Sequence, residues 1–200
     1  MQTRAAVVAL VAVVTAVSVG AQARLTREDA NRFQGKLGKI VLQGKTAPLK
    51  SAKPRATTVT DVELNAYLKF SAGSQVPVGV LEPTLNALGN GRVSGRAIVD
   101  LDVVRKQKQR GWLDPLGYLS GRLPVTAAGT LTTRDGTGQF QLQSAEISGV
   151  TVPKAVLQEL LSFYSRSADN PNGIDMDEPF ELPSRIREIR VGAGTSTIVQ

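Results

Sequence analysis

The chain has 200 residues, 42% of them hydrophobic, which is enough for one compact domain. It carries 24 Lys and Arg against 17 Asp and Glu, a formal charge of +7, and contains neither Cys nor His. These two absences exclude disulfides, thiolate nucleophiles, Ser-His-Asp triads, Cys/His zinc sites and haem ligation by histidine.

The first 23 residues have the pattern of a secretory signal peptide. Arg4 supplies the positive charge, residues 5–19 form an apolar stretch, and Ala21 and Ala23 place small side chains at −3 and −1 of a cut after position 23. The apolar run is shorter than the roughly 20 residues of a transmembrane helix. We therefore expect an exported protein, periplasmic or extracellular, with a single domain over residues 24–200.

Two helices are expected early in this domain. A capping box that starts at Thr26 precedes apolar residues spaced along one face, which predicts a long amphipathic helix over residues 26–43. A second capping box, formed by Thr60 and Glu63, predicts a short helix over residues 61–69.

Beyond residue 80, apolar and polar residues alternate, which is typical of strands with one buried face. Residues 92–103 are predicted to form one long strand, preceded by the hairpin turn Asn-Gly at 90–91. Two further hairpins are expected, with turns at residues 135–136 and 192–194.

Three residues mark expected irregularities and one more helix. Pro83 indicates a bulge or an edge strand, and a change of apolar parity near Ser144 indicates a β-bulge. Pro153 is expected to open an amphipathic helix near the C-terminus. The fold class is therefore α+β: a long, curved antiparallel sheet of hairpins wrapped around the helix over residues 26–43.

Three segments carry a family resemblance: TDVELNAYL at 60–68, the strand from 91 to 103, and PFELP at 179–183 before the last hairpin. With the export signal and the order of elements, they resemble the tubular lipid-binding (TULIP) superfamily, especially its small bacterial exported domains. The resemblance implies an apolar groove between helix and sheet that holds lipid chains.

We expect the protein to bind an apolar ligand, with lipid as the first candidate, and to carry it or present it at a membrane. The alternative is a structural or interaction module of the cell envelope, with a filled core and a basic face. The residues expected to line the groove lie on the first helix and on the sheet: Phe33, Leu37, Val41, Val99, Leu101, Val103, Phe140 and Leu142.

One loop combines basic residues with the only Trp of the chain. Trp and Tyr beside Lys and Arg are typical of membrane-interface contacts. We predict that the loop contacts an anionic membrane surface; the alternative is that it folds its apolar residues over the open end of the core. The contact residues are expected to be Lys106, Lys108, Arg110, Trp112 and Leu113.

The other candidate motifs do not predict phosphate binding, catalysis or a metal site. The glycines at 38 and 44 are separated by five residues, whereas a phosphate-binding loop needs four. Asp100 and Asp102 are interpreted as a solvated strand face, and the acidic loop over residues 169–178 lacks the carboxylates of an EF-hand. We expect no enzymatic activity, no cofactor, no metal and no nucleic-acid partner, and the sequence leaves the oligomeric state open.

Overall fold

The computed structural model describes residues 24–46, 53–106, 120–166 and 170–200. The expected signal peptide lies outside these residues, as do four residues of the predicted membrane contact. These four are Lys108, Arg110, Trp112 and Leu113.

The described residues form an α+β fold with antiparallel sheets. The helices are α1 (Arg27–Lys45), α2 (Asp61–Phe70), the 3-10 turn η1 (Gly73–Gln75), α3 (Leu101–Lys106) and α4 (Lys154–Ser165). The strands are β1 (Ala56–Thr60), β2 (Val80–Gly89), β3 (Arg92–Asp100), β4 (Arg122–Arg134), β5 (Thr137–Ile147), β6 (Val150–Thr151), β7 (Phe180–Glu181), β8 (Glu188–Val191) and β9 (Thr195–Val199).

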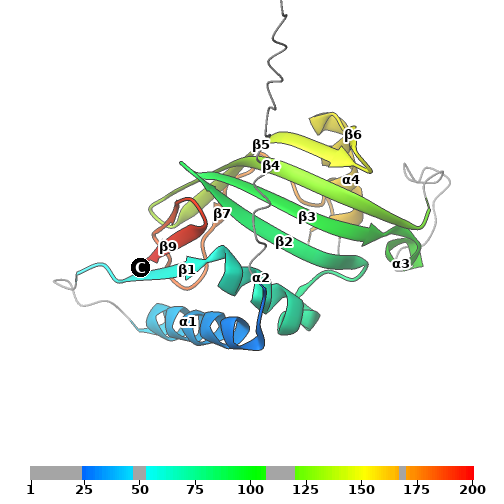
Figure 1. The fold of residues 1–200 in the computed structure, drawn as a ribbon. Coiled ribbons are helices and arrows are strands. Elements are labelled where there is room, and N and C mark those ends of the chain that lie inside the picture. The colour runs from blue at the N-terminus through cyan, green and yellow to red at the C-terminus, as the bar shows by residue number, and fades with distance from the viewer. Residues whose placement is uncertain (1–23, 47–52, 107–119, 167–169) are drawn as a thin grey trace, which may run out of the picture.

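The strands divide into a large and a small sheet (Figure 1). The large sheet has the order β2-β3-β4-β5-β6, with β7 added to the outer side of β5. The small sheet has the order β1-β9-β8, so the last hairpin pairs with a strand formed near the start of the domain. Strand β1 was not predicted, because its five residues follow a basic, proline-containing connector and carry little alternation.

The predicted hairpin turns are confirmed. Asn90 (φ 54°) and Gly91 (φ 76°) connect β2 to β3, and Asp135 (φ 49°) and Gly136 (φ 87°) connect β4 to β5. Both pairs have the two positive φ values of the tight turns that match strand twist. Asn, Asp and Gly tolerate this conformation, which is why these dipeptides predict the turns correctly.

Both predicted bulges are also confirmed by the register. Around Pro83, the pairing of β2 with β3 shifts between Leu81 and Thr84. In β5, Ser144 pairs with Ala128 while residue 142 pairs with residue 129, so one residue of β5 is extra. This restores the apolar residues of β5 to a single face.

The long strand predicted over residues 92–103 is wrong beyond Asp100. The chain turns there into α3, whose first residue is Leu101. Asp100 promotes the change because its carboxylate accepts a hydrogen bond from the amide of Val103 at 3.1 Å, as an N-cap does. Leu101 and Val103 are therefore helical and do not extend the apolar face of β3.

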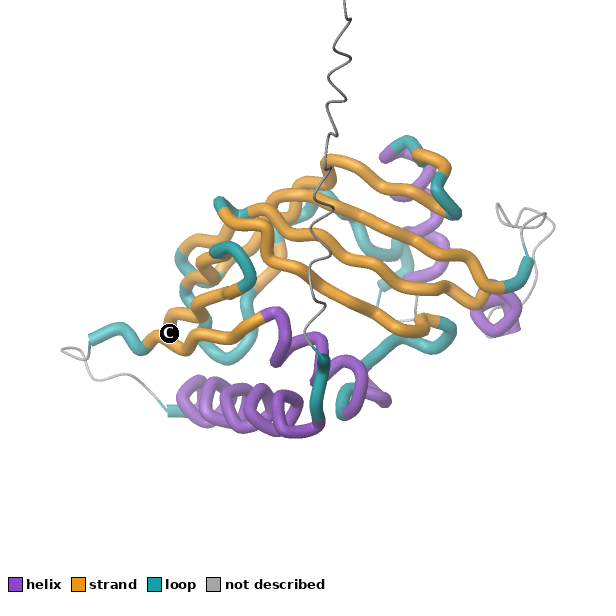
Figure 2. The backbone as a smooth tube through the Cα atoms, in the orientation of Figure 1, coloured by secondary structure: helices purple, strands orange, loops and turns teal. Residues whose placement is uncertain are grey.

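The predicted arrangement of α1 inside the curve of the sheet is not confirmed. Helix α1 packs on α2 and β1, below the large sheet in Figures 1 and 2. Its apolar residues enter a closed core with the small sheet instead. This core consists of Ile40, Val59, Leu182, Ile186 and Ile198, with Phe33 and Ile189 packed against it.

Helix α2 covers the outer edge of β2. The side chain of Asn65 donates to the carbonyl of Leu85 and accepts from its amide, both at 2.8 Å. Asp61 accepts from the amide of Ala87 at 2.9 Å, and Gly194 donates to the carbonyl of Ala87 at 2.8 Å. The edge of the large sheet is thus closed by side chains of a helix and by the turn of the last hairpin.

Helix α4 begins after Pro153, as expected, and lies against β5, behind the large sheet in Figure 1. A following segment is tied along it: Gln158 donates to the carbonyl of Ile174 at 3.0 Å and accepts from the amide of Met176 at 2.8 Å. Lys154 forms an ion pair with Asp177.

Candidate functional site

One face of the large sheet is apolar across four neighbouring strands. Val99 of β3 is paired with Val80 of β2 and with Leu123 of β4, and directly paired residues of antiparallel strands point to the same side. The same row pattern continues from β4 into β5, where residue 131 pairs with Phe140 and residue 129 with Leu142. We call this surface the apolar sheet face.

The apolar sheet face is only half covered. Ala87 and Ala145 are its buried side chains, whereas its larger side chains are intermediate in exposure and Leu85 is 44% exposed. The intermediate residues are Val80, Val93, Val99, Leu123, Val125, Leu131, Phe140, Leu142 and Ile147. The closed core of the described chain lies elsewhere, between α1, the small sheet and the segment that carries Leu182 and Ile186.

The centre of this face has a floor of small residues. Gly95 lies opposite Ala127, which is itself paired with Ala145. Leu85 pairs with Gly95 and covers it, since a β-carbon on Gly95 would lie 3.1 Å from the Leu85 side chain, so the low part of this row consists of Ala127 and Ala145. A β-carbon on Gly129 would lie 2.5 Å from the ring of Phe140, which means that the ring folds over the glycine.

The two ends of the face are closed differently. At one end, a β-carbon on Gly138 would lie 2.7 Å from the ring of Phe180 and 3.4 Å from Leu182, so β7 and the closed core reach the face there. At the other end α3 follows β3, and Leu101 is buried. An ion pair at 3.0 Å between Asp100 and Arg122 holds this end together.

The predicted lining residues are only partly brought together. Val99, Phe140 and Leu142 lie on the apolar sheet face, although Val99 is near one end and the other two are near the opposite end. Leu101 and Val103 belong to α3.

The three predicted lining residues of α1 are not near this face. Phe33 stacks on Tyr67 of α2, with ring centroids 4.9 Å apart. Leu37 is half-buried, and Val41 is exposed. The buried apolar residues of α1 therefore pack against α2 and the small sheet.

The sequence missed most of the residues that form this face. The missed residues lie on β2, β4 and the end of β5: Val80, Leu85, Leu123, Val125, Leu131 and Ile147. Leu123, Val125 and Leu131 alternate along β4, but a bulge changes the parity between Val80 and Leu85 and between Leu142 and Ile147, so the register that places them together follows only from the pairing.

Of the predicted membrane contact, only Lys106 lies within the described residues. It is the last residue of α3, at the end of the sheet where β3 stops.

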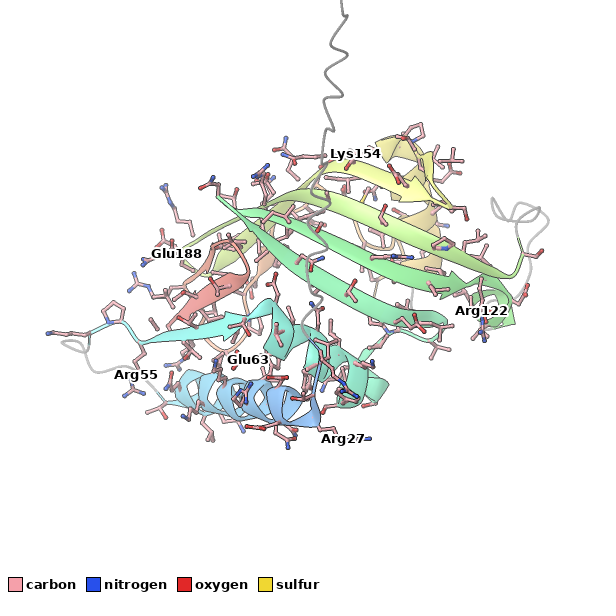
Figure 3. The ribbon with its side chains drawn as sticks, viewed as in Figure 1. Arg27, Arg55, Glu63, Arg122, Lys154 and Glu188 are labelled. Atoms are coloured by element: carbon pink, nitrogen blue, oxygen red, sulfur yellow. The ribbon has the colours of Figure 1, made fainter. Side chains whose placement is uncertain are left out.

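A charged network joins α1 to α2 beside the closed core (Figure 3). Lys36 contacts both carboxylate oxygens of Glu63, at 2.8 and 2.7 Å, and Arg32 lies 3.7 Å from the same group. Glu63 also accepts from the amide of Thr60 at 3.0 Å, completing the predicted capping box. Burial would raise the pKa of Glu63, but the bonds from Lys36 and Thr60 outweigh it and lower that pKa.

The interpretation of Asp100 and Asp102 as one solvated strand face is wrong, because Asp100 is buried and Asp102 lies in α3. The hydrogen bonds from Arg122 and from the Val103 amide lower the pKa of Asp100, so this carboxyl group is a poor general acid. Asp102 lies in α3 and accepts from the amide of Gly121 at 3.1 Å. Both carboxylates anchor α3 to the start of β4.

The opposite face of the large sheet is polar. Arg96, Thr126 and Glu146 form a row across β3, β4 and β5. Around them lies an open hollow of about 190 Å³, whose lining also includes Asn86 and Ser144. This volume is below the roughly 300 Å³ at which ligand pockets begin, so the polar hollow is a weaker candidate than the apolar sheet face.

Within residues 24–46, 53–106, 120–166 and 170–200, no cluster of three or more carboxylates could hold a metal ion. In the same part of the chain, no helix is long and apolar enough to cross a membrane.

Comparison with known proteins does not assign a family. No family model matches the chain, and no curated protein matches it. Among solved structures, the chain is similar to one described as "Crystal structure of lipopolysaccharide binding protein", with 14% identity and a TM-score of 0.23. The match covers 78% of this chain and 45% of that one, so the chain spans less than half of that protein. A TM-score this low does not carry the TULIP resemblance beyond an expectation.

Proposed function

We propose that this protein is an exported, non-enzymatic binder of an apolar ligand, a lipid chain, which lies along the apolar sheet face. The observation that carries the proposal is the separation of the two apolar regions. The closed core, with Ile40 and Ile198, stabilises the fold beside the small sheet, while the apolar sheet face is left half covered. A contiguous apolar surface that the fold leaves partly exposed is typical of a binding site.

The geometry of the face suits an elongated ligand. Strand β3 has nine residues, so the face is about 30 Å long at roughly 3.4 Å per residue. The small residues Ala127 and Ala145 form a low part of the face, with Leu85 beside them over Gly95. An acyl chain that loses roughly 300 Å² of exposed surface gains about 7 kcal/mol before the cost of ordering it.

The groove that we propose therefore differs from the one expected from the sequence. Its floor is the sheet, and in this proposal α4, which contacts β5, borders the groove in place of α1. Leu157, Leu160 and Leu161 of α4 are all half-buried, so this helix has apolar surface left for a ligand.

The test places a charge on one face of a single strand. Leu142 belongs to the apolar sheet face, and the exposed Gln141 beside it points to the other side. With pyrene-labelled phosphatidylglycerol as probe, Leu142→Asp is expected to weaken binding at least tenfold, whereas the control Gln141→Asp stays within about twofold.

Native mass spectrometry of the protein purified from its own cells complements this titration. A mass increment that matches a lipid supports the proposal. The proposal fails if the unmodified protein binds no probe and carries no extra mass, which favours the structural envelope module. It also fails if both substitutions weaken binding equally.

A further inference from the structure

One end of the molecule is strongly basic, and we call it the α1 end. Between residues 30 and 60 the chain contains no Asp or Glu. The basic residues that define the α1 end are all exposed: Lys39, Lys45, Lys53, Arg55 and Arg185.

Hydrogen bonds to backbone carbonyls bring these residues together from three separate parts of the chain. Arg185 donates to the carbonyl of Thr46, at the end of α1, at 3.3 Å. Gln200 donates through its side-chain amide to the carbonyl of Ile40 at 2.9 Å, and the amide of Arg55 donates to the carbonyl of Gln200 at 3.0 Å. Figure 3 places Arg55 beside this end of α1, with Arg27 at the opposite end.

An exposed apolar patch lies among these charges. Leu42 is 66% exposed and Val41 is 38% exposed, both in the last turns of α1 between Lys39 and Lys45. Leu42 points away from the core because Ile40, two residues earlier, is buried on the opposite side of the helix. An exposed leucine with a lysine on either side of it along the helix is typical of a contact with the membrane interface.

The acidic residues of α1 do not neutralise this end. Glu28 and Asp29 lie in its first turn and pair with Arg32. Glu188, the nearest acidic residue after Arg185 in the sequence, is paired with Arg190 at 2.8 Å. The positive charge of the α1 end is therefore free to attract an anionic surface.

We propose that the α1 end docks on an anionic lipid surface, with Leu42 inserted at the headgroup boundary and Lys39, Lys45 and Arg55 among the headgroups. An anionic polymer would use the charges but gain nothing from an exposed leucine, so the apolar patch favours lipid. This docking does not depend on a ligand on the apolar sheet face, and it uses none of the residues of the membrane contact predicted around Trp112.

The experiment measures co-sedimentation with phosphatidylglycerol vesicles at low salt, with phosphatidylcholine vesicles as the uncharged comparison. Lys39→Gln combined with Lys45→Gln is expected to lower the partition coefficient about 25-fold, at roughly fivefold per charge. Leu42→Ser is expected to lower it about tenfold. The control, Arg92→Gln combined with Arg96→Gln on β3, is expected to change it less than the α1 variants.

All variants share residues 1–23 and 107–119, so any binding through those segments is the same in each. The substituted side chains are exposed, and an unchanged melting temperature verifies that each variant is folded. Equal binding to the two kinds of vesicle overturns the proposal, as does unchanged binding in the α1 variants. If Leu42→Ser has no effect and soluble polyphosphate competes fully, the partner is an anionic polymer and the docking is also overturned.

Discussion

The contact between α2 and the edge of the large sheet can be tested with one substitution, Asn65→Ala. Asn65 is buried and makes two hydrogen bonds of 2.8 Å to the backbone of Leu85, one as donor and one as acceptor. At about 1 kcal/mol each, these two bonds contribute about 2 kcal/mol, and each backbone group left without a partner adds a desolvation cost. Alanine returns up to about 0.7 kcal/mol through its higher helix propensity.

The expected loss in unfolding free energy is therefore about 1.5–3 kcal/mol, measured by urea denaturation with an unchanged m-value. Asn31→Ala is the matched control, because Asn31 is exposed on α1, and it is expected to show only the helix-propensity gain of up to about 0.7 kcal/mol. Two further measurements locate the effect. The amide of Leu85 is expected to exchange faster with solvent, and the uncovered edge of β2 is expected to promote self-association in size-exclusion chromatography.

An Asn65→Ala protein with wild-type stability and an equally protected Leu85 amide would refute this account of the edge. A loss of stability without faster exchange at Leu85 would show that the cost comes from a cavity under α2, and would refute it equally.

Two other predictions concern stability. Gly173 has φ +76°, and a β-carbon there would collide with the carbonyl of Ser162, whereas Gly121 has φ +79° and open space around it. Gly173→Ala is therefore expected to lower the free energy of unfolding by about 1–3 kcal/mol more than Gly121→Ala. Equal urea midpoints of the two variants would contradict this. The lowered pKa of Glu63 means that its ion pair stabilises the fold above its ordinary pKa of 4.5 and that this stabilisation is lost as the pH falls through the lower folded value. Glu63→Gln is therefore expected to reduce the fall in melting temperature on acidification. Lys36→Met is expected to lower the free energy of unfolding by about 1.5–3 kcal/mol near neutral pH. An unaltered pH profile in Glu63→Gln would argue against the network.

Local signals in the sequence determined the elements of this fold. The capping boxes at Thr26 and Thr60 start α1 and α2, and Asn90 and Asp135 lead the two hairpin turns. These signals succeed because each depends on bonds or φ values within about four residues, which the order of amino acids specifies directly. The end of β3 at Asp100 is one exception, since a single side-chain cap overrode an alternating apolar pattern.

The pairing of distant elements followed only from the tertiary structure. An amphipathic helix such as α1 needs an apolar surface to bury its stripe, but its periodicity does not say which one. In this protein the partners of α1 are α2 and the small sheet, and that sheet exists because β9 pairs with β1, which has almost no pattern of its own. Because the buried side of α1 packs there, α1 does not cover the apolar sheet face, which stays half covered. The candidate site is therefore decided by long-range pairing that no local sequence signal encodes.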